Sequence, residues 1–535
     1  MHRSSTLVRT LMGGMVVAVF SGLTACVQIQ PRQGLTPRPF SSGQVTWRRC
    51  PRLSPIMGQP RGQCHLGRVP LRWDRIDAPE IEVLVQKLEP EEPRRGTLWV
   101  LDGGPGGTGA IFNTPFWRRL SVERGFALLI PTHRGAGVST GLRCPVQQAS
   151  KSAGGAWVRP SERRACAEHL AETWGNDLAG FTTYEAARDV AHFIARERRP
   201  GEATFLYGGS YGSYWAQRVL EVLPFDVTGV ILEAAIPRNA HFGRLSESVD
   251  EAVQRLLQRC ARSRGCARRF DGDPIGTARR VVEADLVGQG CAARLNVSIE
   301  RRQTLFAATM LTDPTYRVLL APLLFRWDRC RYTDRFVLEE ALRSLPDIGR
   351  SPPDIETFEG TIFDPLIFDL TVADNIVHLD LMKTPLGPSR VAELERTMLA
   401  TNPSARDFVE HKAVWPDPPY PSRTPSAVQV RSPILVFAGE LDARTPLSWS
   451  ARVAEHYDTA TLVVVPWAGH TTSRLVTTPG GTNCTLEAWR AFMDAPEKAV
   501  DETCFAQITP LDLSGTSGAS GRLAEQFLGT RRFFQ

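Results

Sequence analysis

Short runs of apolar residues recur along the first half of this chain, and each run ends in a glycine-rich or polar turn. Three of them are Thr97–Leu101, Phe126–Ile130 and Thr204–Tyr207. Runs of this length without polar interruption are typical of strands that are buried on both faces. They therefore predict the central strands of a covered sheet.

Helical patterns lie between and after these runs. Tyr211–Leu223 carries apolar residues at the spacing of one helical face, and Glu185 follows Thr182 at the spacing of a capping box. A further strand is predicted at Val227–Leu232. Alternating strands and helices predict an α/β fold with a mainly parallel sheet and helices on both faces.

The middle of the chain differs, because strand runs are missing between residues 241 and 425. Three segments there have helical spacing, namely Ser246–Cys260, Thr304–Leu311 and Asp334–Leu345. Strand runs return at Pro433–Ala438 and Ala460–Val465. We therefore expect one sheet built from residues 46–240 and 426–535, with a helical cap inserted at 241–425. Near the C-terminus, Gly515–Gly521 is predicted to be a flexible stretch.

The N-terminus has the pattern of an export signal. His2 and Arg3 precede an uncharged apolar segment, Leu11–Leu23, that is too short for a comfortable membrane span. The segment ends in Leu23-Thr24-Ala25-Cys26, which resembles a bacterial lipobox. This resemblance implies a signal peptide over residues 1–25, lipid on Cys26 and a tether over residues 26–45. An ordinary signal peptide is the alternative, and both predict an exported protein of the cell envelope.

Composition and charge exclude few partners. The 535 residues are 42% hydrophobic and 22% charged, which is typical of a globular protein. The net charge of +6 is spread over 63 basic and 57 acidic residues without a long basic run. We see no nucleic-acid signature, and the oligomeric state stays open.

The cysteines suit an oxidising compartment. Of eleven cysteines, lipid on Cys26 would leave ten, an even number. Connectivity does not follow from sequence, and short loops are a first guess: Cys50–Cys64, Cys144–Cys166, Cys260–Cys266, Cys291–Cys330 and Cys484–Cys504. Zinc-finger spacing and an HExxH motif are both missing, so the motifs indicate no metal.

Ser210 stands in the motif Gly208-Gly209-Ser210-Tyr211-Gly212, between a predicted strand and a predicted helix. Glycines at these places permit the sharp turn that lifts a nucleophilic serine clear of the backbone. A tight turn that contains a serine by chance is the alternative for this motif alone. Asp442 and His470 each follow one of the two late strand runs, so both are expected at the same sheet edge as Ser210. A base and a carboxylate that orients it complete a catalytic triad.

The motifs together resemble those of α/β-hydrolases of the proline iminopeptidase and tripeptidyl aminopeptidase type. They stand at Gly103–Gly107 (G-G-P-G-G), Thr132–Ser139 (D-x-R-G-x-G-x-S), Gly208–Gly212, Gly439–Pro446 (G-x-x-D-x-x-T-P) and Gly469-His470. Thr132 takes the place of the family's acidic residue. The resemblance implies an α/β-hydrolase fold with a helical cap, serine peptidase chemistry and no cofactor.

An oxyanion hole needs backbone N–H groups that face the developing negative charge. Tyr211, which follows the predicted nucleophile, supplies one N–H group. The resemblance implies that the glycine loop supplies the other, at Gly104.

The same loop contains a competing motif. Gly104, Gly106 and Gly109 satisfy G-x-G-x-x-G after a strand, as in dinucleotide-binding proteins. Pro105 interrupts the motif, and Thr132 follows the next strand where an acidic residue would bind a ribose. These departures disfavour a nucleotide cofactor.

Substrate choice depends on the cap. In the family, cap carboxylates bind the free amino group of the peptide, and one lies in a V-C-x-E-like segment. The nearest analogue here is Leu370–Asn375, which lacks the cysteine and has Asp374 in place of Glu. Asp374 is thus a candidate amine contact, and Glu359 and Asp364 are weaker candidates. A cap carboxylate without a role is the alternative for each.

Three functions remain open from the sequence. The first is a serine exopeptidase that cleaves peptides with a free N-terminus through an acyl-enzyme on Ser210. The second keeps the triad but acts on an ester or a small amide. The third is a non-catalytic surface lipoprotein on a hydrolase scaffold.

Overall fold

The computed structural model describes most of the chain from residue 45 onward. The described ranges are 45–50, 62–75, 77–91, 93–149, 151–152, 158–223, 226–346, 367–419, 430–470, 472–475 and 477–534. The predicted signal peptide with Cys26, and the carboxylates Glu359 and Asp364, lie outside them. Among the helices in these ranges, none combines the length and the apolar character that crossing a bilayer requires.

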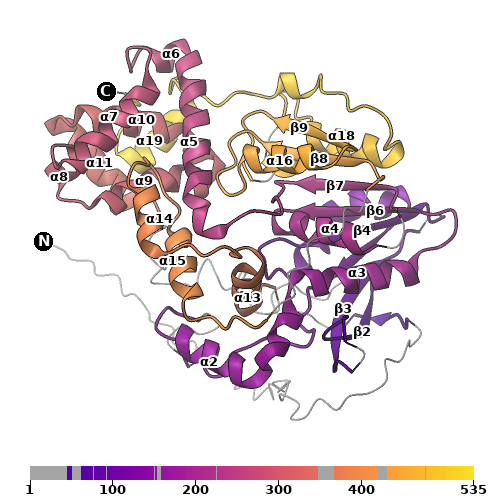
Figure 1. The fold of residues 1–535 in the computed structure, drawn as a ribbon. Coiled ribbons are helices and arrows are strands. Elements are labelled where there is room, and N and C mark those ends of the chain that lie inside the picture. Colours follow the sequence, from indigo (N-terminus) through magenta and orange to yellow (C-terminus); the bar gives the residue numbers. More distant parts are fainter. Residues whose placement is uncertain are drawn as a thin grey trace, which may run out of the picture.

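A nine-stranded sheet in the order β1-β2-β3-β5-β4-β6-β7-β8-β9 forms one lobe (Figure 1). The strands are β1 (Arg48–Arg49), β2 (Gln63–Pro70), β3 (Glu80–Leu88), β4 (Gly96–Leu101), β5 (Phe126–Pro131), β6 (Ala203–Gly209), β7 (Gly229–Glu233), β8 (Ile434–Gly439) and β9 (Ala460–Val465). The neighbours from β5 to β9 are parallel, whereas the pairs from β1 to β5 through β2 and β3 are antiparallel. The predicted mainly parallel sheet is confirmed, and its order is that of the α/β-hydrolase fold.

Helices cover both faces of this sheet. Alternate strand residues such as Trp99 and Leu206 pack in one buried cluster with the helices α3 (Thr183–Glu197), α4 (Tyr211–Val222) and α16 (Leu447–His456). Their neighbours Val100 and Phe205 pack on the other face with α1 (Pro115–Leu120) and α18 (Cys484–Asp494). Because both faces are buried, the strands have continuous apolar sequences.

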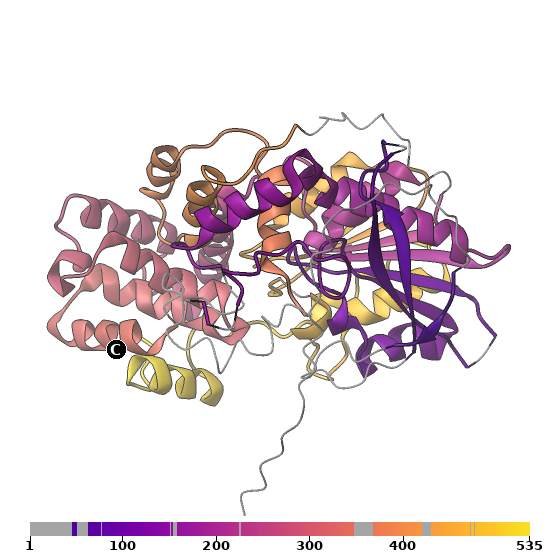
Figure 2. The same cartoon turned by 90° about the horizontal axis from the view of Figure 1, so that it is seen from below.

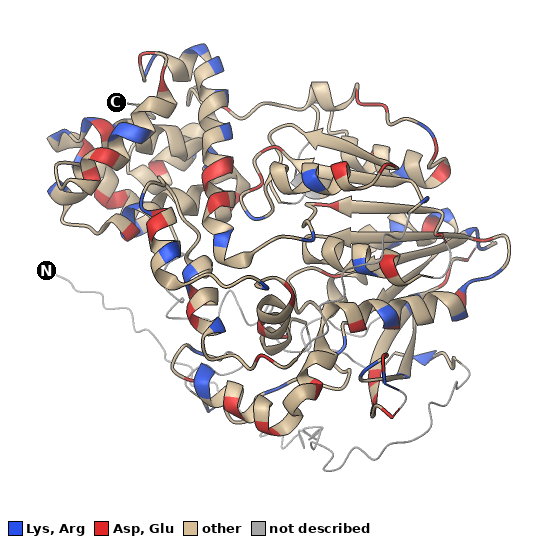
Figure 3. Ribbon diagram, in the orientation of Figure 1, with Lys and Arg blue, Asp and Glu red and all other residues tan. Residues whose placement is uncertain are grey.

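The chain between β7 and β8 forms a second, helical lobe beside the sheet (Figures 1 and 2). Within the described residues its helices are α5 (Leu245–Arg262), α6 (Arg264–Ala267), α7 (Pro274–Leu286), α8 (Cys291–Leu295), α9 (Ile299–Leu311), α10 (Leu320–Arg329), α11 (Tyr332–Ser344), α13 (Leu370–Asp380), α14 (Pro388–Glu395) and α15 (Pro403–Lys412). We call this lobe the helical cap. Its helices α5, α7, α9, α10 and α11 share a hydrophobic core of their own. Charged residues of both signs are interspersed along the cap helices (Figure 3).

The remaining helices are distributed over both lobes. They are α2 (Arg163–Trp174), α17 (Thr472–Leu475), α19 (Gly518–Leu528) and the 3-10 helices η1 (Ala110–Phe112), η2 (Val122–Arg124), η3 (Gly175–Phe181), η4 (Phe242–Arg244), η5 (Pro314–Leu319) and η6 (Phe505–Gln507). The C-terminal helix α19 lies with the cap, where its yellow ribbon sits beside α10 and α11 (Figures 1 and 2). Its residues Ala524, Phe527 and Leu528 belong to the cap core. Residues 511–534 thus return to the cap after the sheet is complete.

The prediction that Gly515–Gly521 is flexible is wrong. The carboxylate of Asp512 accepts hydrogen bonds from the N–H groups of Ser514, Gly515 and Ser517 at 2.7–3.2 Å. The Ser517 hydroxyl then caps α19 by accepting a hydrogen bond from Ser520 N. One carboxylate therefore orders a stretch whose composition suggests a linker.

The capping box predicted for Thr182 and Glu185 is also wrong. Thr182 precedes α3 as expected, but its side chain makes no cap hydrogen bond and donates to Ala179 O at 3.0 Å. Glu185 Oε2 instead accepts a hydrogen bond from Trp73 N at 2.8 Å. Glu185 is buried beside the backbone N–H group of Trp73, and a buried N–H group needs an acceptor. The Glu185 carboxylate meets this need instead of accepting a hydrogen bond from the N–H group of Thr182, as a capping box would require.

Five disulfides link cysteines that are near one another in sequence. The pairs are Cys50–Cys64, Cys144–Cys166, Cys260–Cys266, Cys291–Cys330 and Cys484–Cys504. These are the pairs that short loops suggest. Two of them lie within the cap, and each closes a loop that restricts the unfolded chain.

Candidate active site

Ser210 lies at the turn between β6 and α4 with a left-handed backbone, φ 55° and ψ −126°. Its N–H group donates to Glu233 O at 2.9 Å, and its carbonyl accepts a hydrogen bond from Ser213 Oγ at 2.6 Å. A positive φ is uncommon for a residue with a side chain, and such strain concentrates at functional sites. The turn has the geometry of a nucleophile elbow.

Glycines let the elbow pack tightly. A Cβ atom on Gly208 would lie 2.2 Å from Gly212 O, and one on Gly212 would lie 2.1 Å from Leu101 O. Gly103 approaches from the neighbouring loop, since a Cβ atom there would lie 3.4 Å from Ser210 Cβ. The glycine loop therefore lies directly beside the predicted nucleophile.

Asp442 and His470 lie together at the carboxyl ends of β8 and β9. His470 Nδ1 is 3.0 Å from Asp442 Oδ2 and 3.1 Å from Oδ1. Asp442 is buried and also accepts hydrogen bonds from Arg444 N, Thr445 N and Thr445 Oγ1. Burial would raise the pKa of Asp442, but His470 and the bonds from Thr445 lower this pKa below its ordinary value. A carboxylate that is ionised at neutral pH thus orients the imidazole.

Glu233 ties the serine turn to the histidine loop, and nothing in the sequence singled it out. Its buried carboxylate accepts hydrogen bonds from Tyr207 Oη, from the N–H and hydroxyl groups of Thr472, and from those of Ser473, at 2.6–3.2 Å. Its carbonyl oxygen accepts the bond from Ser210 N. One residue at the end of β7 therefore holds both the elbow and the segment that follows His470.

Within the described residues, the structure records no hydrogen bond between Ser210 Oγ and His470. Ser210 is partly exposed and the His470 side chain is 27% exposed, so both can be reached from solvent. Bonds between a nucleophile and its base are often long until substrate binds. The structure brings the base and the acid together, and it places the serine turn beside them through Glu233.

Asp102 organises the predicted oxyanion loop. Its Oδ1 accepts a hydrogen bond from Gly103 N at 2.7 Å, and its Oδ2 accepts one from Gly109 N at 2.8 Å. Because Asp102 engages the N–H group of Gly103, the N–H group of Gly104 is the next one along the loop that could face a substrate. Tyr211 is the first residue of α4, where N–H groups lack partners within the helix.

The cap helix α13 is fastened to this loop. Asp369 N donates to Gly106 O at 2.8 Å, and Thr108 N donates to Ile367 O at 3.0 Å. The buried Asp369 carboxylate caps α13 by accepting hydrogen bonds from Thr371 N and Val372 N. Burial raises the pKa of Asp369 to about 7, although nearby Arg143 opposes the shift.

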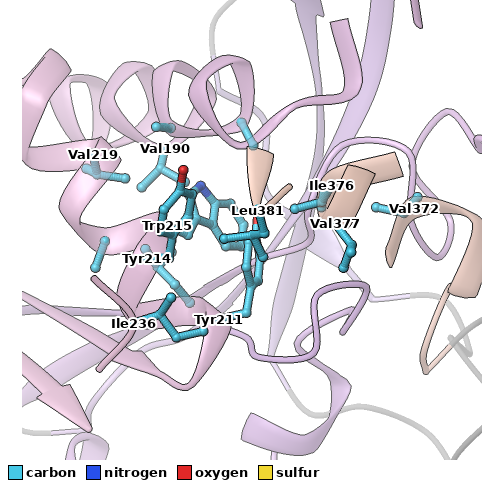
Figure 4. Close-up of a cluster of buried hydrophobic side chains, with 14 of the residues drawn as sticks. Val190, Tyr211, Tyr214, Trp215, Val219, Ile236, Val372, Ile376, Val377 and Leu381 are labelled. Atoms are coloured by element: carbon cyan, nitrogen blue, oxygen red, sulfur yellow. The ribbon is translucent and has the colours of Figure 1, made fainter. Parts of the chain in front are cut away.

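The other end of α13 reaches the elbow. Thr183 Oγ1 donates to Asp380 Oδ2 at 2.6 Å and lies 2.8 Å from Tyr211 Oη, which is 3.1 Å from His133 Nε2. Figure 4 shows Leu381, which directly follows α13, beside Tyr211 and Trp215 of α4, with Ile376 of α13 in the same cluster of buried side chains. The cap helix thus packs on the residue that follows the predicted nucleophile.

The motif Thr132–Ser139 forms a buried loop whose side chains bind to the protein interior. Thr132 Oγ1 donates to Thr108 O at 2.8 Å, a bond within the protein interior. Arg134 is fully buried and forms two hydrogen bonds with Asp189, at 2.7 and 2.5 Å. An arginine that is paired in this way supports the loop.

The acid loop and the histidine loop are bound to the cap. Glu440 accepts two hydrogen bonds from Arg259 of α5, at 2.7 and 2.9 Å, and one from Trp467 N at 3.1 Å. Leu441 and Ala443, on either side of Asp442, belong to the cap core. The position of Asp442 therefore depends on the cap as well as on β8.

Arg317 of η5 lies against the histidine loop. Its side chain is buried, and a Cβ atom on Gly469 would overlap with its guanidinium group. This close approach explains why a glycine precedes His470. Burial lowers the pKa of Arg317, while Asp442 raises it.

Asp374, the candidate amine contact, lies on α13 and faces other cap residues. Its Oδ2 is 3.6 Å from His411 Nδ1 of α15, and its side chain is 20% exposed. Burial raises the pKa of Asp374 to about 7, and Arg163 opposes that shift. Its role as an amine contact stays a prediction.

Comparisons with known proteins add to the geometry. A family model described as TAP-like protein matches residues 402–504, the segment that contains Asp442 and His470. No curated protein matches the chain significantly.

Solved structures resemble the chain at low identity. An esterase from Exiguobacterium antarcticum is 14% identical over 76% of this chain and 94% of its own, with a TM-score of 0.28. A monoacylglycerol lipase from Paleococcus ferrophilus is 14% identical over 76% of this chain and 98% of its own, with a TM-score of 0.31. At these values neither structure bears on the substrate. On its strand order and its elbow, the chain has an α/β-hydrolase fold, and residues 402–504 are similar to TAP-like proteins.

Proposed function

We propose that this protein is a serine hydrolase that cleaves peptides from a free N-terminus. The observation that carries the serine chemistry is the Asp442–His470 pair, 3.0 Å apart, which Glu233 holds beside the Ser210 turn. Three side chains of these types at one sheet edge are the minimum for acyl transfer. A non-catalytic protein would need neither the positive φ of Ser210 nor the hydrogen bond between the buried Asp442 carboxylate and the partly exposed His470.

The proposed reaction uses groups that the geometry supplies. His470 Nδ1 donates to Asp442, so Nε2 of the neutral ring is free to accept the Ser210 proton as Oγ attacks the carbonyl carbon. The N–H groups of Gly104 and Tyr211 stabilise the oxyanion. His470 then protonates the leaving amine, an acyl-enzyme remains on Ser210, and water hydrolyses it with His470 as the base.

The peptidase assignment rests on the motif set and on the TAP-like model that matches residues 402–504. Hydrolysis of an ester or a small amide is the second candidate. It is favoured by one observation, namely that the carboxylate predicted to bind the amine, Asp374, faces His411 in the cap. Both candidates need Ser210.

A fluorophosphonate probe tests the serine chemistry. We expect covalent labelling of the wild-type protein, and we expect the Ser210→Ala variant to lose labelling together with about 10⁶-fold in kcat. Ser263→Ala is the control, because Ser263 is a partly exposed serine of the cap that lies outside the proposed triad and the Ser210 turn. Equal labelling of wild-type protein and Ser210→Ala would contradict the proposal.

A substrate panel tests the choice of substrate. It contains peptide amides with free and with acetylated N-termini, beside short-chain aryl esters. We expect free N-termini to be cleaved at least about tenfold better, a ratio that corresponds to about 1.4 kcal/mol of transition-state binding. Equal cleavage of both peptide sets would exclude an aminopeptidase, and cleavage of esters alone would establish the second candidate.

We also propose that the protein is exported and anchored through lipid on Cys26. Five disulfides support an oxidising compartment. In a bacterial host, the wild-type protein should incorporate an alkyne-tagged fatty acid and fractionate with membranes, whereas Cys26→Ser should do neither. Export without label would leave the ordinary signal peptide as the explanation.

A further inference from the structure

Three side chains of the cap that can ligate a metal converge between two helices. Asp374 and His378 stand four residues apart on α13, so they share one helical face, and His411 faces them from α15. One ligand atom from each side chain lies within 4.8 Å of the other two. His411 Nδ1 is 3.6 Å from Asp374 Oδ2.

Both histidine rings are buried, and within the described residues their nitrogens make no hydrogen bonds. His378 is 1% exposed and His411 is 2% exposed. Among the described residues, none of their four ring nitrogens has a hydrogen-bond partner. A buried imidazole normally satisfies at least one nitrogen, and two adjacent rings that satisfy none indicate a ligand that both can share.

The surroundings suit neutral, lone-pair donors. The ring of Trp415 lies 5.3 Å from that of His378 and 5.1 Å from that of His411, which excludes water from one side. An imidazole binds a metal through the lone pair of a ring nitrogen, and the nitrogens of these two rings are not engaged in hydrogen bonds with described residues. Of two cations close to the cluster, Arg163 is paired with Asp407 through two hydrogen bonds, at 2.6 and 2.5 Å. Lys412 Nζ is engaged by His378 O and by Asp417.

We propose that Asp374, His378 and His411 form a binding site for a divalent transition-metal ion, with Zn²⁺ as the best fit. Two imidazole nitrogens and one carboxylate oxygen are ligands that Zn²⁺ prefers, and a tetrahedral ion leaves a fourth position for water beside the partly exposed Asp374. In such a site the ligand atoms lie roughly 3.3 Å apart, so small side-chain rotations from the present distances complete it.

An ion at this place would clamp α13 to α15. The N–H group of Asp369, the N-cap residue of α13, donates to Gly106 O of the glycine loop, and α13 shares a buried cluster with Tyr211. The clamp would therefore hold the cap against the predicted active site. The site is structural and takes no part in the proposed reaction. It gives Asp374 a role other than binding a substrate amine, and it differs from the expectation that the motifs indicate no metal.

The test is Zn²⁺ binding by the purified full chain after dialysis against a chelator. A chromophoric chelator competes for Zn²⁺ and reports its affinity, and Co²⁺ serves as the spectroscopic probe of the ligands. We expect one equivalent to bind to the wild type, and a loss of more than about 100-fold in affinity in His378→Gln and in His411→Gln. His456→Gln is the matched control, since His456 is exposed and lies outside the cluster.

Two further measurements keep the test decisive. Asp374→Asn changes the most exposed ligand and should weaken Zn²⁺ at least about tenfold, even if a histidine variant fails to fold. Zn²⁺ should raise the unfolding midpoint of the wild type and of His456→Gln but not of the ligand variants. Equal Zn²⁺ affinity in the wild type and Asp374→Asn, or no stoichiometric binding at all, would overturn the proposal. Ser210→Ala should bind Zn²⁺ like the wild type, which separates this site from the proposed reaction.

Discussion

Glu233→Gln tests whether one buried carboxylate positions both the serine turn and the histidine loop. Glu233 Oε1 accepts three hydrogen bonds, from Thr472 N, Thr472 Oγ1 and Ser473 N, and Oε2 accepts two, from Tyr207 Oη and Ser473 Oγ. Glutamine is nearly isosteric and can keep the first three bonds. Its amide nitrogen cannot accept the other two, so both hydroxyl groups must turn away or act as acceptors.

The magnitude follows from these contacts. A hydrogen bond to a charged acceptor contributes about 1.5–3 kcal/mol, against about 1 kcal/mol for a neutral one, so the free energy of unfolding should fall by about 1–3 kcal/mol. Residues 472 and 473 lie next to His470 in the chain, and the loss should shift the imidazole by a fraction of an ångström. A misplacement of this order costs roughly 10–100-fold in kcat.

The assay measures kcat and KM separately on the best substrate of the panel, beside the rate of fluorophosphonate labelling. We expect kcat and the labelling rate to fall while KM changes little, because the substrate contacts are intact. Glu185→Gln is the matched control, since Glu185 is also a buried carboxylate that accepts a backbone N–H group, from Trp73. It should lower stability by a similar amount and leave kcat unchanged.

Two results would refute this reasoning. A Glu233→Gln variant that is less stable but retains wild-type kcat would show that the carboxylate supports only the fold. An equal loss of kcat in Glu185→Gln would show that any weakening of the core slows the reaction.

Three other changes have defined outcomes. Asp442→Asn should lower kcat and the labelling rate by about 10⁴-fold, because asparagine favours the wrong tautomer of His470, and a loss below about tenfold would contradict the triad. Gly212→Ala should lower the free energy of unfolding, measured in urea, by about 3 kcal/mol, because its Cβ atom would lie 2.1 Å from Leu101 O. Gly387→Ala is the control and should change this free energy little, because a Cβ atom at Gly387 would have no neighbouring atom within 4 Å. Burial raises the pKa of Asp369 to about 7, so the free energy of unfolding of the wild type should fall between about pH 4 and pH 7 relative to that of Asp369→Asn, and the difference should stay constant above pH 7. Urea unfolding at several pH values measures this difference. Parallel pH profiles of the two proteins would contradict the prediction.

The sheet and the three proposed catalytic residues follow from local sequence. Strands buried on both faces have continuous apolar runs, and the predicted run Phe126–Ile130 lies within β5, which is buried throughout. Side chains that follow such runs must lie at one edge of a parallel sheet, which is why Asp442 and His470 could be paired before their distance was known. The antiparallel strand β2 was not predicted, since Gln63–Pro70 mixes Cys, His, Arg and Pro with alternating burial.

Contacts between distant segments could not be predicted in the same way. Glu233 is an ordinary polar residue at the end of a strand, and its partners Thr472 and Ser473 come more than 200 residues later. His378 and His411 lie on separate helices without a motif that joins them. The capping-box prediction for Thr182 and Glu185 failed for the same reason, because Glu185 accepts a hydrogen bond from the N–H group of Trp73, which is distant in sequence.

The cap of this protein is part of the frame that carries the acid loop. Arg259 holds Glu440, Leu441 and Ala443 are buried in the cap core, and Arg317 fills the space beside Gly469. A cap that swung open as a rigid lid would break the contacts that hold the loops of Asp442 and His470, so we expect substrate to enter without such a movement. The same connections mean that the two lobes should melt in one transition. An engineered cap from another hydrolase would have to bring its own acid loop with it.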